Sequence, residues 1–178
     1  MASSAPPLLA VLAVLFSAAF FLNSPGALAA EDAGAPPRPD PAHTPMQVLA
    51  FQIRGLVEAA DPDAPEDRGM RTVWAFACPA NQAQTGPYAN FDAMVRTGYS
   101  VLVGHREASV LELVPPEEDR PDACFALLRV VGADGERAWF VWHLTRETQG
   151  ELAGCWMTAA VVPAAEPGGE EAGGGEVA

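Results

Sequence analysis

A chain of 178 residues with 49% apolar and 19% charged side chains has room for one folded domain of about 100 to 150 residues. Its ten basic residues are outnumbered by 23 acidic ones, and the formal charge of -13 disfavours nucleic acids and anionic lipid surfaces as partners. Every basic residue is arginine, so the chain has no lysine for Schiff-base chemistry, general base catalysis or a Walker-type phosphate loop.

Residues 1–30 have the pattern of a signal or targeting peptide. An apolar run without a charge extends from Pro7 to Leu22, helix-breaking residues follow it, and the small side chains near Ala29 and Ala30 suit peptidase cleavage there. A run of about 16 residues is shorter than the roughly 20 that cross a bilayer, so we expect no stable membrane insertion after cleavage. The chain is expected to be exported or organelle-directed and then soluble, either secreted or sent to the chloroplast and its thylakoid lumen. An N-terminal membrane anchor is the alternative.

The rest of the chain divides by composition into three parts. Residues 31–43 are rich in Pro and Ala and predict a flexible arm. Residues 44–163 carry periodic apolar patterns and predict a single α+β domain. Residues 164–178 are mostly Gly, Glu and Ala without periodicity, and they predict a disordered acidic tail.

The domain is expected to begin with a helix. Thr44 supplies an N-cap hydroxyl, Pro45 suits the first helical position, and Gln47 completes a capping box. The helix should continue until Asp61-Pro62, with one apolar face formed by Met46, Leu49, Ile53, Leu56, Val57 and Ala60.

Two further helices are expected before the sheet. The first has an apolar face of Met70, Val73, Trp74 and Ala77, and Pro79 ends it after Cys78. The second is capped by residues 85–87, ends at Gly98, and directs inward the side chains of Phe91, Met94 and Val95.

Four segments then have the branched and aromatic composition of strands, namely residues 109–114, 123–131, 137–145 and 152–162. An acidic loop, residues 115–121, separates the first two strands, and the pairs Asp134-Gly135 and Gln149-Gly150 predict tight turns after the second and third. The expected result is an antiparallel meander, so the fold class is α+β with N-terminal helices packed on a curved sheet.

The central strand of this sheet is apolar on both faces, because Phe140, Trp142 and Leu144 alternate with Trp139, Val141 and His143. Helices are expected to cover one face. The other face then needs a partner subunit, a segment folded over it or an enclosed apolar ligand pocket.

Four segments have a distinctive pattern: Trp74 to Asn81, Thr85 to Tyr88, Gly98-Tyr99 and Gly154 to Thr158. Together they resemble a known family, the domain of unknown function 4864, in its plant-like branch. The resemblance implies a cystatin-like or NTF2-like α+β fold, often behind a leader peptide, and it implies no catalytic residues. An acidic residue often follows the last Thr in the family, whereas Ala159 stands here.

Cys78, Cys124 and Cys155 form an odd set that allows at most one disulfide in an exported protein. If both predicted hairpin turns have two residues, Cys124 and Cys155 lie two strand spacings apart, about 9 to 10 Å, which is too far for a disulfide. Cys78 would still be able to meet one of them. We prefer to interpret all three as small buried hydrophobes, because no Cys-x-x-Cys motif is present.

His143 is the candidate catalytic residue, as a general base reaching into a pocket, although no carboxylate shares its strand face. The candidate ligand-binding residues are Trp139, Trp142 and Trp156, whose rings would line an aromatic cavity or simply fill the core. His43 and His105 lie in an arm and a loop, and the spacing of the histidines predicts no metal site and no cofactor.

These patterns predict a noncatalytic binding or interaction module, which works as a homodimer or holds a small apolar ligand. The alternative hypothesis is a small pocket enzyme, isomerase-like or hydrolase-like, with His143 as its base. A third hypothesis, a thiol-based factor, requires that at least one cysteine reacts readily in the folded chain.

Overall fold

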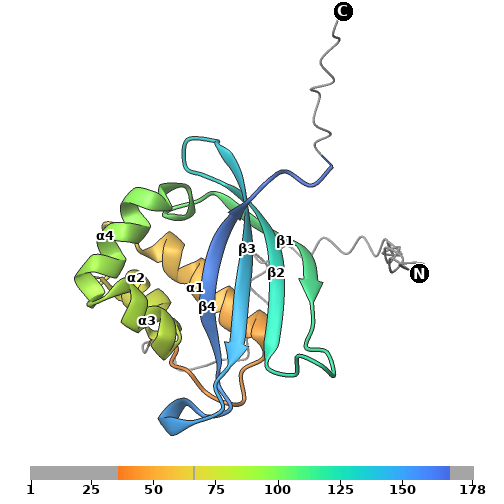
Figure 1. Cartoon of the computed structure of the whole chain (residues 1–178). Coiled ribbons are helices and arrows are strands. Elements are labelled where there is room, and N and C mark those ends of the chain that lie inside the picture. Colours follow the sequence, from red (N-terminus) through yellow and green to blue (C-terminus); the bar gives the residue numbers. More distant parts are fainter. Residues whose placement is uncertain (1–35, 66, 169–178) are drawn as a thin grey trace, which may run out of the picture.

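Four α-helices precede a four-stranded sheet in residues 36–65 and 67–168, which the computed structural model describes (Figure 1). The helices are α1 (Pro45–Glu58), α2 (Arg68–Ala75), α3 (Pro79–Thr85) and α4 (Tyr88–Gly98). The strands are β1 (Glu107–Val114), β2 (Ala123–Val131), β3 (Arg137–Arg146) and β4 (Trp156–Ala164), and two 3-10 helices occupy Ser100–Leu102 and Gly150–Leu152. The predicted leader and most of the predicted tail lie outside the described residues.

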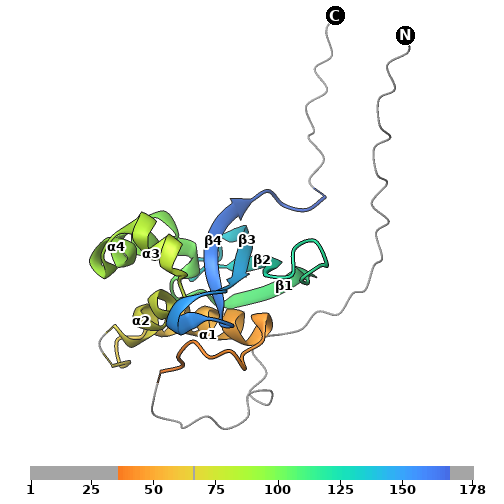
Figure 2. The same ribbon diagram turned by 60° about the horizontal axis from the view of Figure 1, so that its bottom comes forward.

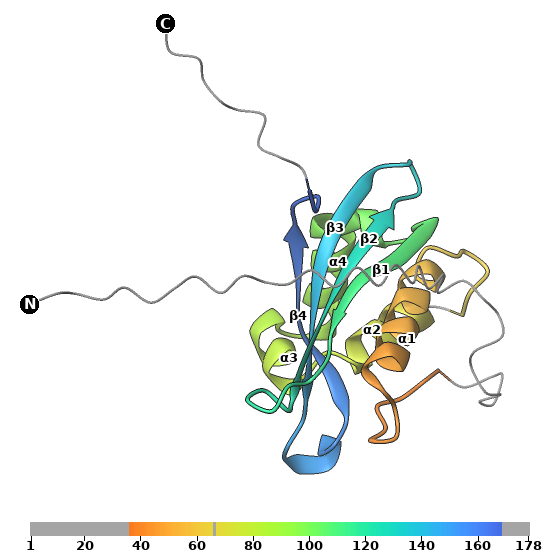
Figure 3. The same ribbon diagram turned by 90° about the vertical axis from the view of Figure 1, so that its right-hand side faces the viewer.

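The sheet is an antiparallel meander in the order β1-β2-β3-β4, as the strand pattern predicts. It is open and curved, and α1 lies behind its strands in Figure 1. Figure 3 shows α1 and α2 on the same side of the sheet, and Figures 1 and 2 place α3 and α4 beyond β4. The predicted α+β class, with N-terminal helices on a curved antiparallel sheet, is confirmed. The finer cystatin-like or NTF2-like assignment stays a prediction.

Helix α1 begins with the predicted capping box. The Thr44 amide donates to Gln47 Oε1 at 2.8 Å, and the Gln47 amide donates to Thr44 Oγ1 at 3.3 Å. The helix ends at Glu58, before the expected Asp61, and Val57 is 43% exposed although the prediction placed it inward. The buried face is instead wider, because the sheet and α2 contact α1 from two directions and bury Val48, Leu49, Phe51, Gln52, Ile53, Gly55 and Leu56.

Helix α3 is absent from the prediction, which took Pro79 as a helix stop. Pro79 is in fact the first residue of α3, a position that proline suits because its missing amide needs no partner there. Cys78 is the N-cap, and its Sγ accepts a hydrogen bond from the Asn81 amide at 3.4 Å. Four helices rather than three therefore precede the sheet in the described residues.

Helix α4 contacts the rest of the domain along a narrow stripe. Phe91 and Val95 are buried, as predicted, but Met94 is 37% exposed. The reason is that α4 lies beyond β4 and packs on its neighbours by one side, where the Phe91 ring lies 5.0 Å from the ring of Trp74.

The loops of the β2–β3 and β3–β4 hairpins are longer than predicted. The Gly132 amide donates to the Glu136 carbonyl at 2.8 Å, which encloses a loop of residues 133–135 with Gly135 at a φ of 92°. After β3, the 3-10 helix Gly150–Leu152 replaces the expected two-residue turn, so β4 begins at Trp156 and not at Leu152. Strand β4 also contains a register shift opposite His143.

The outer edge of β4 is covered by the chain itself. A one-residue parallel bridge joins Ala77 to Thr158, and Asn81 Nδ2 donates to the Thr158 carbonyl at 3.4 Å. Farther along the strand, Tyr99 Oη donates to the Val161 carbonyl at 3.1 Å. The opposite edge of the sheet is β1, whose register against β2 shifts between Val110 and Glu112.

Candidate functional site: the open face of the sheet

The face of the sheet that α1 does not cover has an apolar centre. Alternation along β2 and β3 buries Cys124, Ala126 and Leu128 together with Phe140, Trp142 and Leu144, and it turns the intervening side chains the other way. The register places these outward side chains in rows across β2, β3 and β4. We call this surface the open face; its apolar centre consists of Phe125, Leu127, Trp139, Val141, His143 and Val162.

The open face is only partly shielded by its own side chains. Val162 at the β4 side is 52% exposed, and the other five residues are half-buried. None of the six belongs to the main core cluster or packs against it. A sheet face in a monomer is usually polar when no helix covers it, and this one is apolar at its centre.

Two arginines beside this centre are held in ion pairs. At one end, Arg129 of β2 forms an ion pair with Glu107 of β1. At the other end, Arg120 of the β1–β2 loop pairs with Glu117, and its guanidinium lies 5.8 Å from the ring centroid of Phe125. Glu112 of β1 lies opposite Leu127 at the edge of the open face; it is exposed, and none of the ion pairs among the described residues includes it.

His143 lies within the open face and not in an enclosed pocket. Its ring is stacked on that of Phe125, with centroids 4.5 Å apart and an interplanar angle of 11°. Burial lowers the pKa of His143 below its ordinary value of 6.5. No carboxylate in the described part of the chain forms an ion pair with His143. The hypothesis that it acts as a general base stays a prediction without a paired acid beside it.

The three candidate tryptophans are divided between the two faces of the sheet. Trp142 and Trp156 are buried in the main core, where Trp142 Nε1 donates to Thr158 Oγ1 at 3.1 Å. Trp139 lies on the open face, opposite Arg129. These rings do not line one cavity together, and Trp139 alone of the three belongs to the open face.

The three cysteines are free thiols, and all are buried. Cys124 belongs to the main core, whereas Cys78 and Cys155 form a second small cluster with Met157. Burial raises the pKa of Cys124 and of Cys155, and the charges of Asp40 and Glu147 raise the second further. This environment disfavours the reactive thiolate and fits the interpretation of the cysteines as small hydrophobes.

His105 lies in a loop, as expected, between the 3-10 helix Ser100–Leu102 and β1, and it is buried at 6% exposure. Its Nδ1 donates to the Leu102 carbonyl at 2.7 Å, so this buried ring nitrogen has a partner. Burial lowers its pKa below 6.5, and the hydrogen bond to Leu102 partly opposes that effect. His105 lies two residues before β1, and its hydrogen bond to Leu102 holds it away from the open face.

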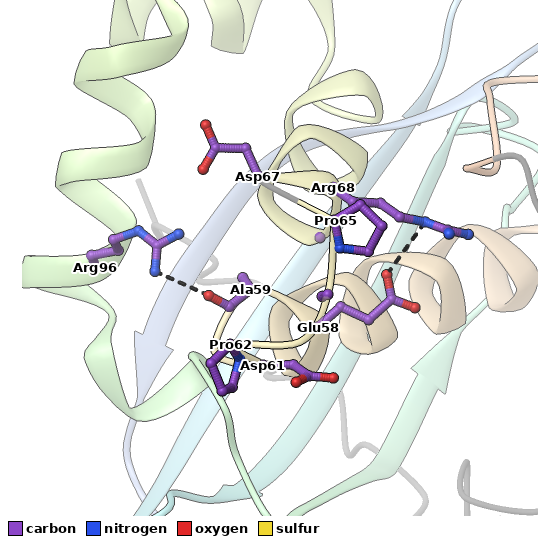
Figure 4. Close-up of a pocket in the computed structure, with 10 residues that line it drawn as sticks. Glu58, Ala59, Asp61, Pro62, Pro65, Asp67, Arg68 and Arg96 are labelled. Atoms are coloured by element: carbon purple, nitrogen blue, oxygen red, sulfur yellow. Dashed lines mark hydrogen bonds and ion pairs between the residues drawn. The ribbon is translucent and has the colours of Figure 1, made fainter.

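A shallow pocket of about 280 Å³ lies away from the open face, between the end of α1, the loop that follows it and α4 (Figure 4). On one side of the pocket, Arg96 Nη1 donates to the Ala59 carbonyl at 3.1 Å. Arg68 Nε lies 3.9 Å from Glu58 Oε2 on the other side. None of the four candidate site residues lines this pocket, so it supports neither an aromatic cavity nor a histidine base.

No group of three His, Cys, Asp or Glu side chains within residues 36–65 and 67–168 is arranged to hold a metal ion. None of the helices in that part of the chain combines the length and the apolar character that crossing a membrane requires.

The sequence predicted only part of the open face. The double apolar character of β3 identified Trp139, Val141 and His143, but the contributions of β2 and β4 were missed. Phe125 and Leu127 alternate with buried residues in the same way, so the period-two pattern of β2 contained the missing signal. Val162 joins them only through a register shift in β4, which no sequence pattern indicated.

The chain was compared with known families, curated proteins and solved structures. The family model described as a domain of unknown function, DUF4864, matches residues 49–165. That range contains all four helices except the first turn of α1, and it contains the whole sheet. No curated protein and no solved structure matches the chain.

Proposed function

The chain belongs to the family of the domain of unknown function DUF4864, and from that premise we propose that it is a noncatalytic interaction module that pairs with a second copy of itself through the open face. The observation that carries this proposal is the contiguous apolar surface of Phe125, Leu127, Trp139, Val141 and Val162 on the side of the sheet away from α1.

The size of the open face suits a dimer. Four strands about 4.8 Å apart and about seven residues long cover roughly 20 by 25 Å, or about 500 Å² in projection. Protruding side chains have more accessible surface than their flat projection, so this approaches the about 800 Å² that each partner buries in a standard interface. A two-fold axis through the open face would bring the same surface of both copies together.

The charge distribution favours the same partner. Two acidic chains repel each other in most orientations, since each carries a formal charge of -13. At the open face, however, Arg129 is paired with Glu107 and Arg120 with Glu117. The exposed carboxylate of Glu112 lies at the β1 edge and not inside the apolar centre, so a second copy can cover that centre without placing two carboxylates inside the contact.

A small apolar ligand is a less suitable occupant, because ligand sites usually bury most of a ligand inside a concave pocket. The pocket described above is lined by Glu58, Asp61, Asp67, Arg68 and Arg96 among others and lies elsewhere. An isomerase-like or hydrolase-like enzyme with His143 as base needs an enclosed site and a proton partner. His143 lies on the open face, and no carboxylate of the described residues forms an ion pair with it, so the structure favours this alternative less.

The test is the oligomeric state of the full chain as isolated from cells, measured by sedimentation velocity at micromolar concentration. We expect a dimer. Val162→Lys places a charge in the interface at a side chain that is half exposed in the single chain, so the monomer should fold while the dimer separates. The matched control is Val57→Lys, which adds the same charge at a similarly exposed valine of α1 and should leave the dimer intact.

Two results would contradict the proposal. The first is a wild-type chain that sediments as a monomer throughout the concentration range. The second is a dimer that survives Val162→Lys but separates in Val57→Lys, which would move the interface to the helices. Circular dichroism of both variants shows whether each one is folded, so that loss of the dimer is not confused with loss of the fold.

We also propose that the chain functions outside the cytosol, after export from the cell or delivery to an organelle such as the chloroplast. The apolar run of Pro7–Leu22 and the small residues up to Ala29 and Ala30 support this location. Mass spectrometry of the chain isolated from its own cells should show a mature N-terminus near Glu31. A chain that keeps Met1 and fractionates with membranes would instead support the anchor.

A further inference from the structure

His143 is the one titratable group inside the apolar centre of the open face. In the register it lies between Phe125 of β2 and Ala160 of β4, and its ring is stacked on Phe125 at 4.5 Å. Val141 lies two positions away on the same strand face, so the imidazole is surrounded by apolar groups on the strands beside it. A second copy placed over this surface would cover His143 as well.

The charged groups around His143 offer no anion to a protonated ring. Arg120, from the β1–β2 loop, lies on the Phe125 ring that His143 stacks against, and it is itself paired with Glu117 and Asp119. Farther along the face, Arg129 pairs with Glu107. Glu112 of β1 is opposite Leu127 and is exposed at the sheet edge. On the β4 side, the position facing His143 is the apolar Ala160.

In the single chain, burial alone already lowers the pKa of His143. Covering the ring with the apolar centre of a second copy would remove water that still solvates the imidazolium. Desolvation without a compensating charge disfavours the protonated form, so the pKa must be lower in the dimer than in the monomer. Binding between the copies and protonation of His143 therefore oppose each other.

We propose that His143 makes the dimer sensitive to pH: the two copies pair through their open faces while both imidazoles are neutral, and they separate when the imidazoles take up protons. This inference rests on the dimer proposed above and adds its regulation. The sensitivity comes from the position of one histidine within an apolar interface and requires no other change in the chain.

The sign and the steepness follow from linkage. The dimer is fully stable above the pKa of His143 in the monomer and weakens as the pH falls from there toward its lower pKa in the dimer. Two copies take up two protons on separation, so the dissociation constant rises by up to about 100-fold per pH unit within that window. Below the window the dependence levels off.

The experiment measures the dimer dissociation constant of the full chain by sedimentation equilibrium from about pH 8 to about pH 5.5, the range in which histidine titrates. For the wild type we expect a rise of at least about tenfold on acidification. His143→Phe keeps an aromatic ring to stack on Phe125 but cannot be protonated, so its dissociation constant should stay level. His105→Asn is the control for the other buried histidine and should behave as the wild type does.

Proton NMR of the His143 ring supplies a second measurement. Its pKa in the wild-type dimer should lie below its pKa in the monomeric Val162→Lys variant. A wild-type dimer whose dissociation constant does not change with pH, or the same change in His143→Phe, would refute this regulation and leave the dimer itself standing. Absence of a dimer at about pH 8, where histidine is neutral, would refute the dimer and its regulation together.

Discussion

Gln52 of α1 and Thr158 of β4 are 106 positions apart in the chain, yet their side chains meet in a buried hydrogen bond of 2.7 Å from Gln52 Nε2 to Thr158 Oγ1. Trp142 Nε1 of β3 donates to the same hydroxyl at 3.1 Å. The Thr158 backbone is bonded as well, since its amide donates to the Phe76 carbonyl at 2.7 Å. One threonine thus joins the first helix, two strands and the segment between α2 and α3.

We expect Thr158→Val to be strongly destabilising. Valine has nearly the same shape, but it leaves the amide of Gln52 and the indole of Trp142 without their shared acceptor inside the core. Each of these two buried polar groups costs about 1 to 3 kcal/mol when it loses its partner, so the free energy of unfolding should fall by about 2 to 6 kcal/mol. Urea denaturation measures it. Thr158→Ser keeps the hydroxyl and should lose less; equal losses in both variants would show that the methyl group matters and the hydrogen bonds do not.

Gly69 of α2 allows α1 and α2 to contact each other through their backbones. A Cβ atom at Gly69 would lie 2.5 Å from the Ala59 nitrogen and would also collide with the Gly55 carbonyl oxygen. Because backbone cannot move aside as a flexible side chain can, Gly69→Ala should lower the free energy of unfolding by about 1 to 3 kcal/mol.

The matched control for this glycine is Gly98→Ala, at the end of α4. A Cβ atom at Gly98 meets nothing within 4 Å, so this variant should unfold within about 1 kcal/mol of the wild type. Thermal unfolding of both variants measures how much stability each substitution costs. A Gly69→Ala protein as stable as Gly98→Ala would mean that α1 and α2 separate without cost.

The thiols should react slowly in the native chain. Cys78, Cys124 and Cys155 are buried, and burial raises the pKa of the last two, so little thiolate is present and reagents reach it poorly. A chromogenic disulfide reagent at neutral pH should detect them only after guanidinium is added. Rapid reaction of any one of them in the folded protein would revive the hypothesis of a thiol-based factor.

His105 predicts a loss of stability in acid. Its pKa in the folded chain is lowered from 6.5 by burial, so the fold favours the neutral ring. Its contribution is therefore fully present above about pH 6.5 and is lost as the pH falls toward the lower pKa of the folded state. One proton accounts for at most about 1.4 kcal/mol per pH unit.

The measurement is urea unfolding of wild type and His105→Asn at neutral and at mildly acidic pH. Asparagine keeps a donor for the Leu102 carbonyl but does not titrate, so the variant should lose less stability on acidification than the wild type. Parallel curves for the two proteins would show that His105 is as easily protonated in the folded chain as in the unfolded one.

Local signals predicted most of the elements. The capping box of Thr44 and Gln47 located the start of α1, and the apolar strand patterns located β2 at residues 123–131 as the structure has it. Where the prediction was wrong, the cause was tertiary. Val57 and Met94 have helical spacing that suits burial, but the neighbouring elements do not extend over them. Pro79 permits either a helix end or a helix start, and the contacts of the Cys78–Asn81 segment with Thr158 favour the start.

The candidate site was predicted in its central strand and missed at its margins. Alternation in one strand reveals two apolar faces, but it does not reveal which residues of other strands lie beside them, since that depends on register. Gln52 was hidden for a related reason. In the sequence, a glutamine within an apolar helical stripe gives no sign of a buried hydrogen bond. Its partner Thr158 lies 106 positions away, so no local pattern connects the two residues.

The self-covered edge of β4 has a consequence for polymerisation. A sheet grows into a filament only when each added chain presents a fresh free edge, and here Ala77, Asn81 and Tyr99 already occupy one of the two edges. Strand addition can therefore proceed from β1 alone. Two chains that joined through β1 would leave only their closed edges exposed, so such growth would end at a pair and could not continue into a fibre.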